Sequence, residues 1–182
     1  MLLLKLFYLE EWLTDYSIYK FILYSFPVFL LFILVFTGFE LSIIYHNLII
    51  SFNFVYILIF FWVLKKPEII GFGLIFLSGI INDVILNFPI GLSSINYLIL
   101  CVMASLLRNR TLTPNLLYDW IFFFLSILIV NSSNYILQTL IFSSDMSYES
   151  LMSNTICTSL VYPIFAKIFN KINIYNLREG NA

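Results

Sequence analysis

Residues 68–107 read EIIGFGLIFLSGIINDVILNFPIGLSSINYLILCVMASLL. They hold two long apolar runs, Glu68–Leu86 and Gly91–Leu107, which are separated only by residues 87–90. A helix of about 20 apolar residues is long enough to cross the hydrocarbon core of a membrane. The short break contains Pro89, which ends the preceding helix, and the glycine that follows can adopt a positive φ. This stretch therefore predicts two membrane-spanning helices joined by a tight turn.

The whole chain has the composition of an integral membrane protein. Of its 182 residues, 62% are hydrophobic and only 10% are charged, whereas soluble domains have about 45–50% apolar and about 25% charged residues. No apolar run alternates as the strands of a membrane barrel do. The predicted spans are residues 21–38, 41–64, 68–86, 91–107, 116–142 and 150–169. We therefore predict a single membrane domain over residues 1–182, an all-α integral membrane protein built as a six-transmembrane-helix bundle.

The basic residues predict the orientation of this bundle. Lysine and arginine are enriched in the cytoplasmic loops of membrane proteins. With six spans, all nine lysine and arginine residues fall on the side that holds both termini. The opposite loops carry only acids, namely Glu40, Asp145 and Glu149. We therefore expect both the N terminus and the C terminus to be cytoplasmic.

Two segments are harder to assign than the rest. The predicted span over residues 41–64 contains the polar residues His46, Asn47, Ser51 and Asn53, but a re-entrant segment there would place Lys65 and Lys66 outside, so we expect it to cross. Leucines at helical spacing predict that residues 1–19 form a short interfacial helix on the inner membrane surface, with a frayed apolar tail as the alternative. No small-residue cleavage site follows the first apolar run, so we expect it to be retained as a span.

Polar side chains gather at one predicted depth. A helical rise of about 1.5 Å per residue places Asn82 and Asp83 in the outer part of the bundle, where other helices also carry polar groups. This outer polar cluster comprises His46, Asn47, Asn96, Asn131 and Asn134. Two interpretations stay open: amides that pair between helices as packing, or a cavity that is open to the outside.

Asp83 is the only acid well inside a predicted span, and it therefore needs a hydrogen-bond partner. The side-chain candidates are Asn82, His46 and the Asn131/Asn134 pair. The alternative is the backbone of the turn over residues 87–91, which follows the end of the same helix. The sequence does not choose between these partners.

The chain lacks the residue patterns of an enzyme or a metal protein. His46 is the only histidine, which excludes a site built from several histidines. Neither Gly-x-Ser-x-Gly nor His-Glu-x-x-His occurs. Cys101 and Cys157 lie in apolar runs, and we expect small core residues there. The net charge of −1 gives no surface for nucleic acid. We expect a protein that is not an enzyme and holds no cofactor or metal.

The central motifs follow one another in a distinctive order. A predicted helix begins at Lys66-Pro67 and continues into Ser-Gly-Ile-Ile-Asn-Asp at residues 78–83. The turn that follows is Phe-Pro-Ile-Gly-Leu at residues 88–92. The next span ends at Arg108 and Arg110. This order resembles that of the MreD family of bacterial rod shape-determining membrane proteins. The family signature is a basic-Pro start, a Gly-Leu-x-x-Asp helix and a Pro-Leu-Gly-Leu turn. In this chain isoleucine stands at two of the leucine positions, 80 and 90.

The resemblance implies a non-enzymatic membrane scaffold of the cell-elongation machinery, located in the bacterial inner membrane. Such a protein associates with MreC to organise lateral peptidoglycan synthesis and to maintain rod cell shape. RodA, its partner transpeptidase and the MreB filament system would be direct or indirect partners, and membrane lipid would surround the bundle. The signature residues would shape the outer surface that receives MreC: Pro67, Gly79, Asn82, Asp83, Pro89 and Gly91.

An alternative function comes from the same resemblance, because the family is similar in fold to the substrate-binding components of energy-coupling-factor transporters. The chain would then be a small-molecule-binding membrane component of such a transporter. Those components dock their membrane partner through small residues spaced four apart on the first helix. Here the first span contains no alanine, and the chain has only Ala104, Ala166 and Ala182. This deficiency counts against the alternative.

Overall fold

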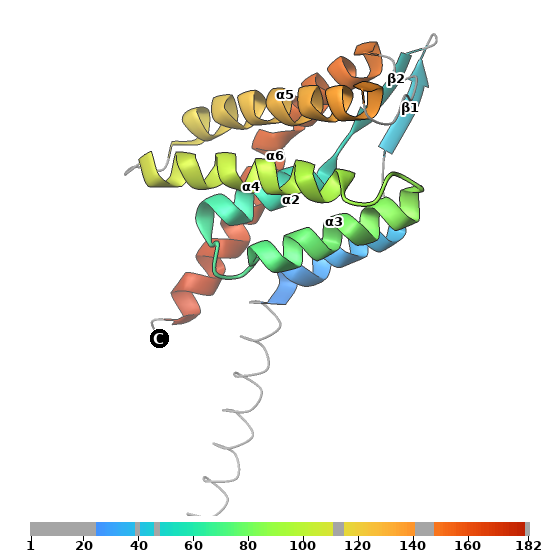
Figure 1. Ribbon diagram of the computed structural model, residues 1–182. Helices are drawn as coiled ribbons and strands as arrows, with labels where there is room; N and C mark the ends of the chain where they lie inside the picture. The colour runs from blue at the N-terminus through green and yellow to red at the C-terminus, as the bar shows by residue number, and fades with distance from the viewer. Residues whose placement is uncertain (1–24, 39–40, 46–47, 111–114, 141–147, 181–182) are drawn as a thin grey trace, which may run out of the picture.

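The computed structural model describes residues 25–38, 41–45, 48–110, 115–140 and 148–180. Within these ranges the chain forms six helices and one β-hairpin (Figure 1). The helices are Ser25–Thr37, α2 Phe54–Lys65, α3 Phe72–Leu86, α4 Leu92–Arg110, α5 Leu116–Leu140 and α6 Tyr148–Gly180, and the strands are β1 Leu41–Tyr45 and β2 Leu48–Phe52. The prediction of a helical bundle is confirmed for the body of the molecule. The interfacial helix predicted over residues 1–19 lies outside the described residues.

The prediction of one continuous helix over residues 41–64 was wrong. Its first half is the β-hairpin, in which β1 and β2 run antiparallel with Leu41 opposite Phe52 and Tyr45 opposite Leu48. The runs LSIIY and LIISF are rich in isoleucine, which favours strands. Only two residues separate the strands, a connection length typical of hairpins. The prediction rested on average hydropathy, which is the same for an apolar strand and for an apolar helical segment.

Asn53 separates the hairpin from α2. Its side-chain Oδ1 accepts a hydrogen bond from the backbone nitrogen of Tyr56 at 3.3 Å and so caps the helix. Its own backbone nitrogen donates to Thr158 Oγ1 of α6 at 3.0 Å. The junction is therefore tied to α6, along which β2 packs.

Helix α2 is the centre of the bundle. All ten residues from Val55 to Leu64 are buried. A helix that is apolar on every side needs neighbours on every side. The ring of Phe60 lies 5.0 Å from that of Phe123 in α5 and 5.8 Å from that of Tyr162 in α6. α4 packs against another side of α2 (Figure 1).

Successive helices alternate in direction, so their connections gather at two ends of the bundle (Figure 1). The turn end holds the β-hairpin, the α3–α4 connection over residues 87–91 and the start of α6. The basic end holds Lys65 and Lys66 after α2, and Arg108 and Arg110 at the end of α4. The predicted alternation of the chain is retained, although the second predicted span is not one helix.

Apolar side chains cover much of the outside of the bundle. α4 and α5 are each long and apolar enough to cross a membrane. In α5, only 28% of the most apolar stretch of 18 residues is buried inside the molecule. α2 and α3 have 12 and 15 residues. α3 starts at Phe72, later than predicted, because residues 67–70 form a turn in which Ile69 N donates to Lys66 O at 3.2 Å.

Candidate functional site

Asp83 at the end of α3 holds the start of α4. The residue is fully buried; its Oδ2 accepts a hydrogen bond from Gly91 N at 2.7 Å, and its Oδ1 accepts one from Ser93 N at 2.9 Å. The first N–H groups of a helix have no partner within the helix, and the helix dipole favours a negative charge beside them. Among the predicted partners of Asp83, the structure selects the backbone of the turn. The acid of one helix therefore caps the next.

Gly79 lets α3 and α4 approach closely. A Cβ atom built on Gly79 would lie 2.5 Å from Ser94 Cα, a separation that no real side chain could occupy. Next to this contact, Asn82 Nδ2 donates to Ser93 Oγ at 3.0 Å, and Ser94 Oγ donates to the carbonyl of Phe76 at 3.0 Å. Small residues and hydroxyls at a close crossing are typical of helix packing in membranes. These contacts hold α3 and α4 together as a closely packed helical hairpin.

The turn between the two helices uses two left-handed residues. Asn87 has φ 56° and ends α3, and Gly91 has φ +99° directly before α4. Pro89 lies between them. Five of the six signature residues, Gly79, Asn82, Asp83, Pro89 and Gly91, therefore belong to one structural unit, which we call the signature hairpin. Pro67 does not, because it lies in the α2–α3 connection at the basic end.

A polar cavity of about 190 Å³ lies beside the signature hairpin at the turn end. Residues from β2, α2, α3, α4, α5 and α6 line it. Three members of the predicted outer polar cluster, Asn96, Asn131 and Asn134, come together there. The other two, His46 and Asn47, lie outside the described residues. The wall also includes Asn82, which the helical rise placed in the same part of the bundle, and further polar side chains: Ser51, Asn53, Ser93, Gln138, Ser150 and Asn154.

Most of the amides in this wall also pair with a neighbour. Asn131 Nδ2 donates to Thr155 Oγ1 at 2.7 Å and so links α5 to α6. Asn154 Nδ2 donates to Ser51 Oγ at 2.8 Å, which links α6 to β2. Hydrogen bonds of this kind hold helices together in membranes. The two interpretations of the cluster are therefore not exclusive, since the same amides form interhelical bonds and line a cavity.

Asn96 on α4 differs from these amides. The residue is only 3% exposed, and its Oδ1 has no hydrogen-bond partner among the residues that the structure describes. A buried acceptor without a partner costs about 1–3 kcal/mol. Asn96 also lines the cavity, but its Oδ1 itself has almost no accessible surface.

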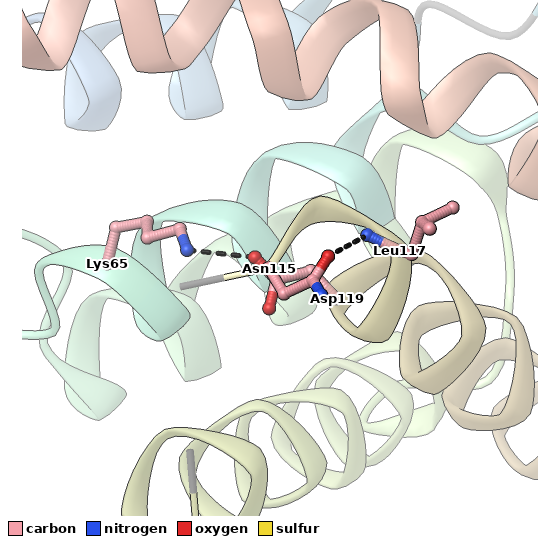
Figure 2. A network of polar contacts seen from close by, with 4 residues as sticks. All are labelled: Lys65, Asn115, Leu117 and Asp119. Carbon is pink, nitrogen blue, oxygen red and sulfur yellow. Dashed lines mark hydrogen bonds and ion pairs between the residues drawn. The ribbon is translucent and has the colours of Figure 1, made fainter. Parts of the chain in front are cut away.

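A second polar feature lies at the basic end. Lys65 Nζ of α2 and Asp119 Oδ2 of α5 form an ion pair at 2.8 Å (Figure 2). Asp119 is in the first turn of α5, where the helix dipole favours an acid, and Asn115 precedes it as a cap by accepting a hydrogen bond from Leu117 N at 3.0 Å. The pair was not predicted. The signal was present, because Lys65 follows one predicted span and Asp119 opens another on the same predicted side.

Metal-binding groups do not cluster in the described ranges: no three histidine, cysteine or carboxylate side chains come together there. Cys101 is buried and Cys157 is half-buried, and both are free thiols. No lining residue of the cavity in these ranges carries a charge. The chemistry of the site is therefore that of neutral amides and hydroxyls.

Comparisons of the chain with protein-family models, with curated proteins and with solved structures find no match. The resemblance to the MreD family rests on the motif residues between Lys65 and Arg110, most of which lie in or beside the signature hairpin.

Proposed function

We propose that this chain is a non-enzymatic membrane scaffold of the bacterial elongation machinery, which associates with MreC to organise lateral peptidoglycan synthesis and to maintain rod shape. The observation that supports this proposal is the signature hairpin. Each of three signature residues has a specific structural role in that unit. Gly79 allows the close contact, Asp83 accepts the hydrogen bonds at the start of α4, and Gly91 adopts the positive φ. A rigid hairpin that ends in an exposed turn suits a docking surface.

The hairpin also supports a division of roles. Asp83 is buried, so it positions the turn and does not touch a partner. The side chains available to a partner are those that the turn exposes, above all Ile90 at 75% and Phe88 at 36% exposure. Apolar side chains held on a rigid element make good contacts because little conformational freedom is lost when they bind. We therefore propose Ile90 and Phe88 as contacts for MreC.

The proposed orientation places the basic end in the cytoplasm and the turn end outside, in the bacterial inner membrane. The support is the position of Lys65, Lys66, Arg108 and Arg110 at one end of the bundle. Both termini would then be cytoplasmic, as the distribution of charges predicts. RodA, its partner transpeptidase and the MreB filament system would be reached directly or through MreC.

A photo-crosslinking experiment tests the proposed contact. A crosslinking amino acid replaces Ile90, and the matched control replaces Leu117, an equally apolar residue that is 63% exposed at the basic end. We expect MreC to be captured from Ile90 and not from Leu117. Asn87 is a poorer position for the probe, because its φ of 56° strains most side chains. Capture of MreC from neither position, in cells where MreC is present, would overturn the proposal.

The cavity supports one alternative function, that of a small-molecule-binding component of an energy-coupling-factor transporter. Its support is the polar cavity at the turn end, which a scaffold does not need. Co-purification of the chain with a transporter ATPase module, and not with MreC, would favour this alternative.

A further inference from the structure

The polar cavity at the turn end has features of a ligand site that the scaffold function does not use. We propose that it binds one small, uncharged, polyhydroxylated ring, a monosaccharide or a monosaccharide headgroup, through the amide and hydroxyl side chains of its wall. The proposal is independent of MreC binding, so either can fail without the other.

The lining excludes charged ligands. The cavity is surrounded by amides, hydroxyls and tyrosines, and none of its lining residues in the described ranges can neutralise a charge. Moving an ion from water into such a site without an opposite charge costs several kcal/mol. Each Asn or Gln side chain instead presents one acceptor oxygen and one donor amide group. Neighbouring hydroxyl groups of a sugar are both donors and acceptors, and they match a wall of amides.

The cavity also has an aromatic side. Tyr56 of α2 and Tyr97 of α4 line it, and their rings meet edge to face at a centroid distance of 5.9 Å. Phe88 of the turn lines it as well. Aromatic rings cover the apolar C–H faces of a ligand while nearby polar groups bind its edge. A sugar ring has both kinds of surface, whereas a simple hydrocarbon has only the apolar one.

Size limits the ligand to a single ring. The volume of about 190 Å³ is smaller than the roughly 300–1,000 Å³ of sites for drug-sized molecules. It corresponds to the space of about six water molecules at roughly 30 Å³ each. Among its lining amides, Asn96 and Asn131 are buried, whereas Asn82, Asn134 and Asn154 are half-buried.

Calorimetric titration of the full chain, purified in a detergent without a sugar headgroup, tests the proposal. The probes are glucose and glucuronate, which share a ring and differ by one carboxylate. We expect saturable binding of glucose and at least tenfold weaker binding of glucuronate. A second arm places the chain in nanodiscs with and without a monoglucosyl lipid, and an increase in the unfolding temperature that requires this lipid would assign the site to a headgroup. Equal binding of both sugars, or no response to glucose and to the lipid, would overturn the proposal.

Two substitutions on α4 locate the binding site. Asn96→Leu replaces a polar lining side chain by an apolar one of similar volume, and Asn109→Leu, at the exposed basic end of the same helix, is the matched control. We expect Asn96→Leu to weaken binding at least tenfold and Asn109→Leu to leave it unchanged. If Asn96→Leu does not fold, Asn134→Leu, at a half-buried lining position, takes its place. Binding that survives the substitutions at the cavity would show that the sugar is held elsewhere. Capture of MreC by the Asn96→Leu protein should be unaffected.

Discussion

Asp83 Oδ2 lies 2.7 Å from the backbone nitrogen of Gly91, so the last turn of α3 holds the first turn of α4. The second carboxylate oxygen binds Ser93 N, which leaves both oxygens of this buried acid with a partner. In a membrane, a helix start that lacks such partners is costly because no water replaces them. The acid thus stabilises a point at which the chain reverses between two closely packed helices.

Asp83→Ala removes both of these hydrogen bonds and is expected to destabilise the protein. Hydrogen bonds to a charged group contribute about 1.5–3 kcal/mol each, and since these two share one cap we expect a total loss of about 2–4 kcal/mol. Insertion should not suffer, because a neutral residue enters the bilayer more readily than Asp. Unfolding of the purified protein, followed by circular dichroism, measures the loss, and co-purification with MreC should fall.

Glu149→Ala is the control for that measurement, because Glu149 is exposed at the start of α6. It should leave both the stability and the co-purification unchanged. Normal rod shape and undiminished recovery of MreC with Asp83→Ala would refute the proposed role of Asp83 in positioning a docking surface for MreC.

Gly79→Ala tests the close crossing of α3 and α4. The new Cβ would meet the backbone of Ser94 at 2.5 Å, so the two helices must move apart. Overpacking of this kind costs about 1–3 kcal/mol. The control is Gly73→Ala in the same helix, where a Cβ meets nothing within 4 Å. Gly73→Ala should be neutral or stabilising by up to about 1 kcal/mol, because alanine has the higher helix propensity.

The opposite signs of these two glycine substitutions make the comparison informative. Thermal unfolding midpoints measured under one detergent condition are sufficient. If both alanine variants behave alike, the crossing at Gly79 is looser than the structure describes.

Gly91→Ala and Asn87→Gly probe the turn in opposite directions. Gly91 has φ +99°, a region that L residues avoid, so alanine there should cost about 1–3 kcal/mol. Asn87 has φ 56°, which glycine adopts without strain, so Asn87→Gly should be close to neutral. Denaturant or thermal titrations of the two variants check this ordering. A reversed order would mean that the backbone of the turn differs from the one described here.

The sequence predicted the positions of the apolar segments along the chain better than their secondary structure. The observed α4 and α5, Leu92–Arg110 and Leu116–Leu140, lie within a few residues of the spans predicted over residues 91–107 and 116–142. Charged and turn-forming residues mark these boundaries clearly. The hairpin over Leu41–Phe52 was missed because span prediction counts apolar residues and ignores their pairing. The useful signal was the near-symmetry of LSIIY and LIISF about a two-residue connection.

The part of the candidate site that could be predicted is the depth of its residues in the bundle, because this depth follows from helix geometry alone. A constant rise per residue placed Asn96, Asn131 and Asn134 at similar heights, and all three line one cavity. The contacts of individual side chains could not be predicted in this way. Which partner Asp83 selects depends on the path of the turn, and the unpaired state of Asn96 Oδ1 depends on the packing of several helices.

Asp119→Asn tests the ion pair at the basic end. The substitution keeps the shape of the side chain and removes its charge, which leaves Lys65 Nζ without a counter-charge at a site where Asp119 is only 6% exposed. We expect a loss of about 1.5–3 kcal/mol, the range for a hydrogen bond to a charged group. Lys65→Met alone should also destabilise, and the double variant should lose less than the sum of the two, because the remaining partner is then no longer an unpaired charge. Unfolding titrations at low and high salt complete the test. The coupling between the two residues should persist in 0.5 M salt, because a largely buried pair is poorly screened. Additive losses of stability would show that the two residues do not interact.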